Sequence, residues 1–257
     1  MSQALLQVRD LTVELKNRGT VLSGISFDIQ AGEIVGIFGE SGCGKTTLAL
    51  AILNLLPRNR YTVRGSVRLR GQELAGLSER AMQPIRGAVI SMISQDPMLA
   101  LNPLMRVRQQ ITEVLRAHRA AGKAASLLEL AGLCPSERIL EAYPHQLSGG
   151  ERQRVTIAQA LACRPALVIA DEPFTALDAV RVVELATLFR GLKEKIGSSF
   201  LVISHSPGVL ARIADSVLVM QDGRIVEQGT ASAVFGSPKH PYTAAVLVAA
   251  ERTADRA

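Results

Sequence analysis

Residues 39–46 restrict the fold of this chain more than any other segment, because they read Gly-Glu-Ser-Gly-Cys-Gly-Lys-Thr, a G-x-x-x-x-G-K-[ST] pattern. An apolar run (residues 34–38) precedes the pattern and a helical pattern (residues 45–56) follows it, which is the strand–loop–helix context that it requires. Its glycines let the backbone turn N–H groups toward an anion, and the helix N-terminus adds partial positive charge. We expect Lys45 to reach the phosphates of a nucleotide and the Thr46 hydroxyl to bind Mg²⁺. The predicted nucleotide-binding residues here are Gly39, Glu40, Ser41, Gly42, Cys43, Gly44, Lys45, Thr46 and Thr47.

A pair of carboxylates follows another apolar run. Residues 166–170 (ALVIA) lead directly into Asp171 and Glu172. An apolar run of this kind is typical of a strand buried in a parallel sheet, and such a strand ends at the sheet edge where ligands bind. We expect Asp171 to hold Mg²⁺, and Glu172 to orient and deprotonate an attacking water molecule.

Strand and helix patterns alternate along the chain, which predicts an α/β fold with a parallel sheet. The strand-rich start, about 1–30, predicts a small antiparallel sheet beside the core, and a mostly helical middle lies at roughly 97–150. Asp222-Gly223 predicts a hairpin turn. Strands are expected at 5–15, 25–29, 34–38, 88–93, 166–170, 200–204 and 216–220, and helices at 45–56, around 106–121, 123–132, 151–163 and 179–196.

Composition excludes several classes of protein. Of the 257 residues, 47% are hydrophobic, which argues against intrinsic disorder, and the longest apolar runs fall far short of the roughly 18–20 residues that span a bilayer. The start of the chain has no export signal, and the three cysteines form no C-x-x-C pair, so we expect a reducing cytoplasm. The net charge of +6 comes from 23 arginines and 6 lysines, spread along the chain. Three explanations of this positive charge stay open: binding to nucleic acid, contact with anionic lipid, or a GC-rich genome that favours arginine codons.

A second anion-binding segment precedes the carboxylates. Residues 147–151 read Leu-Ser-Gly-Gly-Glu, and a serine with two glycines at the start of a predicted helix offers free N–H groups. The phosphate loop, this segment and Asp171-Glu172, in this order and spacing, resemble the ATP-binding cassette family, and the resemblance covers nearly the whole chain.

The resemblance implies a P-loop NTPase core with a parallel sheet, an N-terminal antiparallel β subdomain and an inserted helical subdomain. It implies a single domain over 1–257: a RecA-like core at about 1–95 and 151–240, a helical subdomain at about 96–150, and a short C-terminal tail at 240–257.

It also implies further site residues, with ATP and Mg²⁺ as the bound species. In the family, the segment that corresponds to Ser148, Gly149 and Gly150 caps the γ-phosphate held by a partner subunit's phosphate loop. Gln95 matches a glutamine that contacts Mg²⁺ and the attacking water, and His205 matches a histidine that contacts the γ-phosphate. Asp178 matches a loop that carries information across the dimer.

One departure from the family concerns the base. The family often stacks adenine on an aromatic residue near the end of the first strand, where this chain has Leu15 and no aromatic ring.

Three stretches resemble the peptide/nickel importer subgroup: residues 95–103 (QDPMLALNP), 143–150 (YPHQLSGG) and 240–243 (HPYT). Residues 55–57 and 85–87 favour the first of the two ATPases that such systems carry. The chain ends soon after residue 243 without the cysteine cluster of many peptide transporters, which favours nickel over di- or oligopeptides. The implied partners are a related second ATPase, two permease subunits and, indirectly, a solute-binding protein. The implied location is the cytoplasmic face of the inner membrane.

Three rival functions share part of the pattern. DNA-maintenance ATPase heads use the same loops, but their helical section is interrupted by long heptad repeats, which this sequence lacks. Ribosome-associated cassette proteins carry two cassettes in one chain, and a nucleotide kinase would lack residues 147–150. We therefore expect no nucleic-acid partner. Of the functions considered, the sequence most resembles the ATPase of an importer.

Overall fold

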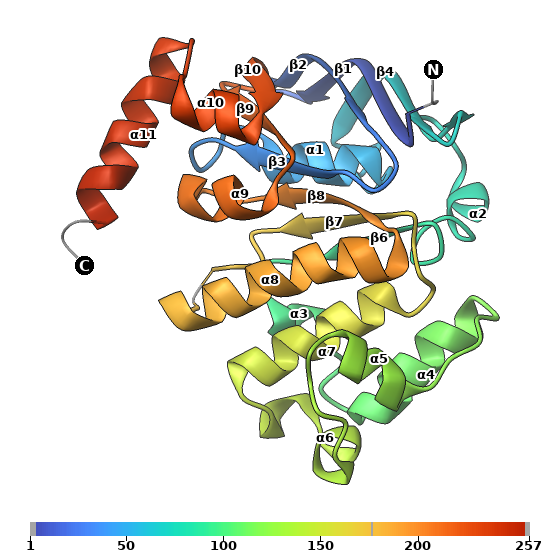
Figure 1. The fold of residues 1–257 in the computed structure, drawn as a ribbon. Coiled ribbons are helices and arrows are strands. Elements are labelled where there is room, and N and C mark those ends of the chain that lie inside the picture. Colours follow the sequence, from blue (N-terminus) through green and yellow to red (C-terminus); the bar gives the residue numbers. More distant parts are fainter. Residues whose placement is uncertain (1–3, 176, 255–257) are drawn as a thin grey trace.

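The computed structural model describes residues 4–175 and 177–254, which form two β-sheets and the helices that cover them (Figure 1). The strands are β1 (Leu6–Leu15), β2 (Gly19–Ile29), β3 (Ile34–Phe38), β4 (Tyr61–Leu69), β5 (Gln72–Glu73), β6 (Ile90–Ile93), β7 (Leu167–Asp171), β8 (Ser199–Ile203), β9 (Ser216–Gln221) and β10 (Arg224–Thr230). The helices are α1 (Lys45–Ile52), α2 (Glu79–Met82), α3 (Pro97–Ala100), α4 (Val107–Ala117), α5 (Ala124–Leu130), α6 (Glu137–Glu141), α7 (Gly149–Leu161), α8 (Ala179–Ile196), α9 (Pro207–Ile213), α10 (Ala231–Gly236) and α11 (Pro241–Ala254), with a 3₁₀ turn at Pro144–Gln146.

The larger sheet has the strand order β10-β9-β3-β8-β7-β6, and all of its strands except β10 run parallel. β3, β7 and β8 are buried along their whole length, which is why their sequences are continuous apolar runs. β8 pairs with β3 on one side and with β7 on the other, and Ile203 lies opposite both Ile37 and Asp171. The residues that follow these three strands therefore meet at one edge of the sheet.

Successive residues of each central strand face two different hydrophobic cores. Val35 and Ile37 of β3 belong to the core shared with α1 and the antiparallel sheet, of order β2-β1-β4-β5. Ile34 and Phe38 belong to the core shared with α7, α8 and α9. In Figure 1, α1 lies between the two sheets and α8 and α9 lie on the opposite face of the larger one. The phosphate-loop strand is thus fixed from both sides.

The middle of the chain is helical, as its sequence pattern predicts. Along the chain, helices α3 to α6 come after β6 and before α7. Figure 1 shows them gathered at the end of the molecule away from the antiparallel sheet. Helix α8 has the predicted bounds, 179–196. Among the described residues, no helix is long and apolar enough to cross a membrane.

Several predicted bounds were wrong, for identifiable reasons. The first helix ends at Ile52 rather than at 56, because Asn54 takes a left-handed conformation (φ 51°) and its side chain donates to the Leu77 carbonyl. Helix α7 begins at Gly149 rather than at 151, because Ser148 already caps it. The predicted tail at 240–257 contains α11. The sequence pattern also failed to predict strand β4. Its buried and exposed residues alternate only weakly, and Gly65 lies in its middle, so it has little of the usual strand signal.

Candidate nucleotide-binding site

The phosphate loop connects the buried end of β3 to the first residue of α1. Gly39, Gly42 and Gly44 all have positive φ angles (156°, 84° and 105°). A Cβ on Gly39 would lie 2.3 Å from the Met220 carbonyl oxygen, and one on Gly44 would lie 2.6 Å from a Leu22 methyl carbon. The loop therefore requires glycine both for its backbone conformation and for its contact with neighbouring strands.

Lys45 lies inside the loop that precedes it. It is only 7% exposed, and its Nζ donates to the Gly39 carbonyl at 2.7 Å and to the Glu40 carbonyl at 2.8 Å. The ammonium group is thus already at the centre of the anion-binding loop. Cys43 is half-buried, and burial raises the pKa of its thiol, which fits a small space-filling residue better than a reactive thiolate.

Two segments distant in sequence hold this loop in place. The N–H of Gly223, at the hairpin turn between β9 and β10, donates to the Cys43 carbonyl at 3.1 Å. The hydroxyl of Tyr242, on α11, accepts from the N–H of Glu40 at 3.0 Å. The sequence predicted this hairpin turn and singled out the segment around Tyr242, but it assigned neither a contact with the phosphate loop.

Asp171 is the last residue of β7 and faces the start of α1. It is 3% exposed, and its Oδ1 has no hydrogen-bond partner among the described residues. Burial raises the pKa of Asp171, although a hydrogen bond from the Thr46 hydroxyl opposes that shift. A buried carboxylate oxygen without a partner, beside a hydroxyl, is a donor set that suits a hard cation such as Mg²⁺.

The side chains of Glu172 and His205 are hydrogen-bonded to each other. Glu172 has a left-handed backbone conformation (φ 48°), and its N–H donates to the Ile203 carbonyl at 3.0 Å. Its Oε2 lies 2.8 Å from the Nδ1 of His205. A non-glycine residue is rarely found in this conformation, and such residues concentrate at functional sites.

A cavity of about 380 Å³ joins these groups. Its lining contains all three predicted catalytic residues, Gln95, Glu172 and His205, together with residues of the phosphate loop. Its lining contains no Phe, Tyr or Trp among the described residues, and Leu15 is not part of it. The lining residues are Ser41, Gly42, Gly44, Lys45, Thr46, Thr47, Gln95, Glu172, Thr175 and His205; Thr175 had not been predicted.

The second anion-binding segment lies elsewhere. Ser148 caps α7 by accepting from the N–H of Glu151, and the Glu151 carboxylate accepts from the N–H of Ser148 at 2.8 Å. Ser148 and Gly150 line a different cavity, of about 220 Å³, together with Arg181 of α8. Asp178 caps α8 and accepts from the N–H of Arg181 at 2.9 Å. Within one chain, the lining of the phosphate-loop cavity therefore includes none of Ser148, Gly150 and Asp178. Residue 176 lies outside the described residues.

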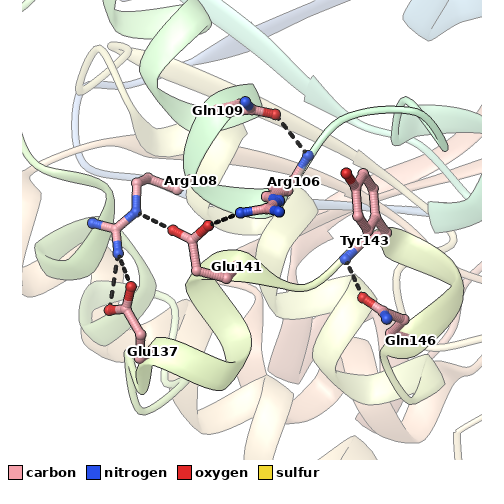
Figure 2. A network of polar contacts seen from close by, with 7 residues as sticks. All are labelled: Arg106, Arg108, Gln109, Glu137, Glu141, Tyr143 and Gln146. Carbon is pink, nitrogen blue, oxygen red and sulfur yellow. Dashed lines mark hydrogen bonds and ion pairs between the residues drawn. The ribbon is translucent and has the colours of Figure 1, made fainter.

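A network of polar side chains fixes the helices around this second segment (Figure 2). Arg108 on α4 donates to Glu141 at 2.7 Å and to Glu137 at 2.9 Å, both on α6, and Glu141 also binds Arg106. The Arg106 guanidinium lies 5.7 Å from the centre of the Tyr143 ring. These contacts join the start of α4 to α6 and to the turn that leads into Ser148.

A family profile and several known proteins are similar to this chain. A family profile described as ABC transporter matches residues 22–175. The oligopeptide transport ATP-binding protein OppD of Bacillus subtilis is 45% identical over 95% of this chain and 71% of its own length. OppD of Salmonella typhimurium is 43% identical over 98% and 77%, and the dipeptide transport ATP-binding protein DppD of B. subtilis is 43% identical over 95% and 76%.

Solved structures with the same fold are also ATP-binding cassettes. A dimeric post-hydrolysis state of the cassette MJ0796, bound to ADP and phosphate, has a TM-score of 0.76 and 27% identity over 88% of this chain and 98% of that one. CbiO1 from Clostridium perfringens, part of the ABC transporter complex CbiONQ, has a TM-score of 0.77 and 25% identity over 92% of each chain. The sequence motifs, the fold and these relatives together show that the chain belongs to the ABC transporter family, as an ATPase whose hydrolysis of ATP powers transport.

Proposed function

We propose that this chain is the nucleotide-binding subunit of a peptide importer and hydrolyses ATP in the 380 Å³ cavity. The observation that carries the proposal is that this one cavity joins the phosphate loop to Gln95, Glu172 and His205. The loop N–H groups, the start of α1 and Lys45 bind the phosphates. The oligopeptide and dipeptide transport names of the relatives support a peptide as the solute. The preference for nickel stays an untested prediction.

Glu172 is the proposed general base. Its bond to His205 keeps one carboxylate oxygen oriented, and its neighbour Asp171 is buried, so Glu172 is the carboxylate that lines the cavity. It accepts the proton of the attacking water. His205 orients Glu172 and contacts the γ-phosphate, and Gln95 contacts the water.

Thr46, Gln95 and Asp171 are the residues that we propose hold Mg²⁺. The partnerless Asp171 Oδ1 and the adjacent Thr46 hydroxyl support this assignment. The ion supplies charge that stabilises the phosphate oxygens during transfer. Asp171 and Thr46 come from β7 and α1, and these two elements contact each other.

A second subunit completes the site in this proposal. Ser148, Gly149 and Gly150 offer a helix N-terminus to the γ-phosphate, and Ser148 and Gly150 line a cavity other than the one that holds the phosphate loop. A partner chain therefore supplies that cap, and Asp178 lies beside the same cavity through its contact with Arg181. The dimeric cassette MJ0796 supports this arrangement. The partner is a related second ATPase.

We propose that the helical insert 97–146 is the surface that docks on the permease subunits, of which there are two, at the cytoplasmic face of the inner membrane. Leu99 and Leu104, just after Gln95, are 86% and 84% exposed, and Met98 is also exposed. Gln110 is buried, and its side chain bonds to Asn102 and to the Met105 carbonyl, so this apolar surface is held firmly to α4. Exposed apolar side chains on a fixed segment are typical of a protein interface.

A DNA-maintenance head has no specific support here. In the described residues between β6 and α7, the longest helix is α4, with 11 residues, and the relatives are transport proteins.

The test of the catalytic assignment is Glu172→Gln, which keeps the size of the side chain and removes its basicity. We expect ATP binding to persist and hydrolysis to fall by at least 100-fold, within the range that general-base catalysis contributes. Nucleotide affinity and phosphate release measure the two effects. Glu129→Gln, on the exposed face of α5, is the matched control and should hydrolyse ATP like the wild type.

Turnover at the wild-type rate in the Glu172→Gln variant would refute Glu172 as the base. Co-purification from membranes tests the partners: two permeases and a sister ATPase should accompany the chain, whereas recovery with DNA or ribosomes would refute the importer assignment.

A further inference from the structure

One peptide unit of the phosphate loop is held from both of its ends. The carbonyl oxygen of Gly39 accepts from Lys45 Nζ at 2.7 Å. The N–H of Glu40, which belongs to the same peptide unit, donates to the hydroxyl of Tyr242 at 3.0 Å. These two bonds fix the orientation of the peptide, because a rotation by 180° would break both.

The orientation of this peptide matters for Lys45. Gly39 has no side chain to restrict its ψ angle, so the peptide that follows it rotates more easily than most. In the rotated state an N–H group would face the ammonium group of Lys45, which can only donate hydrogen bonds. Lys45 would lose one of its two carbonyl partners, and the remaining bond to the Glu40 carbonyl would hold its position less firmly.

The tyrosine is itself anchored independently of the loop. Glu227 on β10 accepts from the N–H of Lys239 at 2.8 Å and from that of His240 at 3.1 Å, which fixes the start of α11. Tyr242 is half-buried, and burial raises the pKa of its phenol, so the hydroxyl stays protonated at neutral pH. A rigid segment about 200 residues downstream thus reaches the loop.

We propose that Tyr242 is a positioning residue for ATP binding, because its hydroxyl keeps the Gly39–Glu40 peptide in the orientation that places Lys45 for the phosphates. The inference rests on the proposed function, since it concerns the same cavity. Without the hydroxyl, only a fraction of free molecules would present the competent loop, and the apparent affinity for ATP falls by that fraction. Once ATP is bound, its phosphates themselves hold the loop, so the rate of hydrolysis is unaffected.

Tyr242→Phe tests the proposal, because it removes the hydroxyl and keeps the ring and its packing. A hydrogen bond of this kind corresponds to roughly a 3–10-fold change in an equilibrium. We therefore expect the KM and the Kd for ATP to rise about 3–10-fold, with kcat within about twofold of the wild type. The full-length protein is used for ATPase kinetics and for titration with a fluorescent ATP analogue.

Tyr61→Phe is the matched control, because Tyr61 on β4 is half-buried and its hydroxyl makes no hydrogen bond within the part of the chain that the structure describes. It should leave KM and kcat unchanged. An unchanged KM in Tyr242→Phe would overturn the inference. A fall in kcat at constant KM would also overturn it, since that result would indicate general loosening of the fold.

The two proposals fail separately. If the wild type binds ATP, Lys45→Ala abolishes that binding and Tyr242→Phe matches the wild type, only the inference about Tyr242 is wrong. If the wild type neither binds nor hydrolyses ATP, the proposed function is wrong and the inference falls with it.

Discussion

Gly39 and Gly191 show how differently two glycines contribute to this molecule. At Gly39 an added Cβ would meet the Met220 carbonyl, so the residue cannot change without moving the phosphate loop. Gly191 lies inside α8 with no atom within 4 Å of an added Cβ and no positive φ angle. Here glycine only adds conformational freedom to the unfolded chain, which lowers stability.

Gly191→Ala should therefore stabilise the protein. Replacing an unhindered glycine in a helix interior contributes about 0.5–1 kcal/mol. Urea unfolding should show this increase in the free energy of unfolding, with ATPase activity unchanged. A decrease in stability would mean that the backbone or the surroundings of residue 191 differ from this structure.

Individual site residues were predictable where the signal is local. The contiguous pattern at 39–46 predicts Lys45 and Thr46 as site residues, and a buried strand followed by two acids predicts Asp171 and Glu172. Tyr242 and Gly223 contact the loop from positions far along the chain, and no local pattern encodes such contacts. Thr175 is an ordinary residue type in a loop and reaches the cavity only through the fold.

At the scale of elements, capping decides where helices begin. The reciprocal Ser148–Glu151 bonds start α7 at the two glycines and leave their N–H groups at its exposed end. Amphipathic periodicity alone placed this start two residues too late, because glycines carry no hydrophobic signal. The contact between α11 and the phosphate loop needs a similar fixed start, which Glu227 provides from β10.

Glu227 should make stability depend on pH. Burial alone would raise its pKa, but the nearby Thr243 hydroxyl and the hydrogen bonds from the N–H groups of Lys239 and His240 outweigh it and lower the pKa below the ordinary 4.5. A carboxyl whose folded-state pKa is depressed stabilises the fold above the unfolded-state pKa, and this contribution is lost as the pH falls through the folded-state value. At neutral pH, Glu227→Gln should lower the free energy of unfolding by about 1 kcal/mol.

Denaturant unfolding from pH 7 down to pH 3 measures this dependence. The gap between the wild type and Glu227→Gln should narrow as the pH drops below about 4.5. Glu194→Gln, on the exposed surface of α8, should behave like the wild type at every pH. A gap that stays constant across this range would show that the charge of Glu227 does not hold the start of α11.

At the scale of the whole molecule, the strand order β10-β9-β3-β8-β7-β6 brings the ends of β3, β7 and β8 together. The α/β class followed from the alternating patterns, but the order in which strands pair did not, because parallel strands of similar apolar composition pair without a local code. The same fold keeps apart the two anion-binding helix ends, those of α1 and α7, which Figure 1 shows in different parts of the molecule. In the proposed dimer, each chain therefore contributes one half to each of two sites.

Complementation between two inactive variants tests whether these halves act between chains. The purified chain is used without the related ATPase, so that a second copy of the same chain takes the partner's place. Lys45→Ala removes the phosphate-binding cation. Gly149→Asp adds an anion at the start of α7, where there is room for a side chain and where the helix dipole favours it, so the fold should persist while a phosphate is repelled. Each variant alone should lack ATPase activity, since both of its composite sites are damaged.

In a mixture, a pair made of one chain of each kind regains one intact site: Lys45 from the Gly149→Asp chain and Gly149 from the Lys45→Ala chain. Random pairing would make about half of all pairs mixed, and each would have one working site, so we expect about a quarter of the wild-type rate if sites act independently. The measurement is phosphate release at a protein concentration where the wild type is active. A mixture no more active than its components would mean that α7 serves the phosphate loop of its own chain, because only a site shared between chains can be restored by exchanging partners.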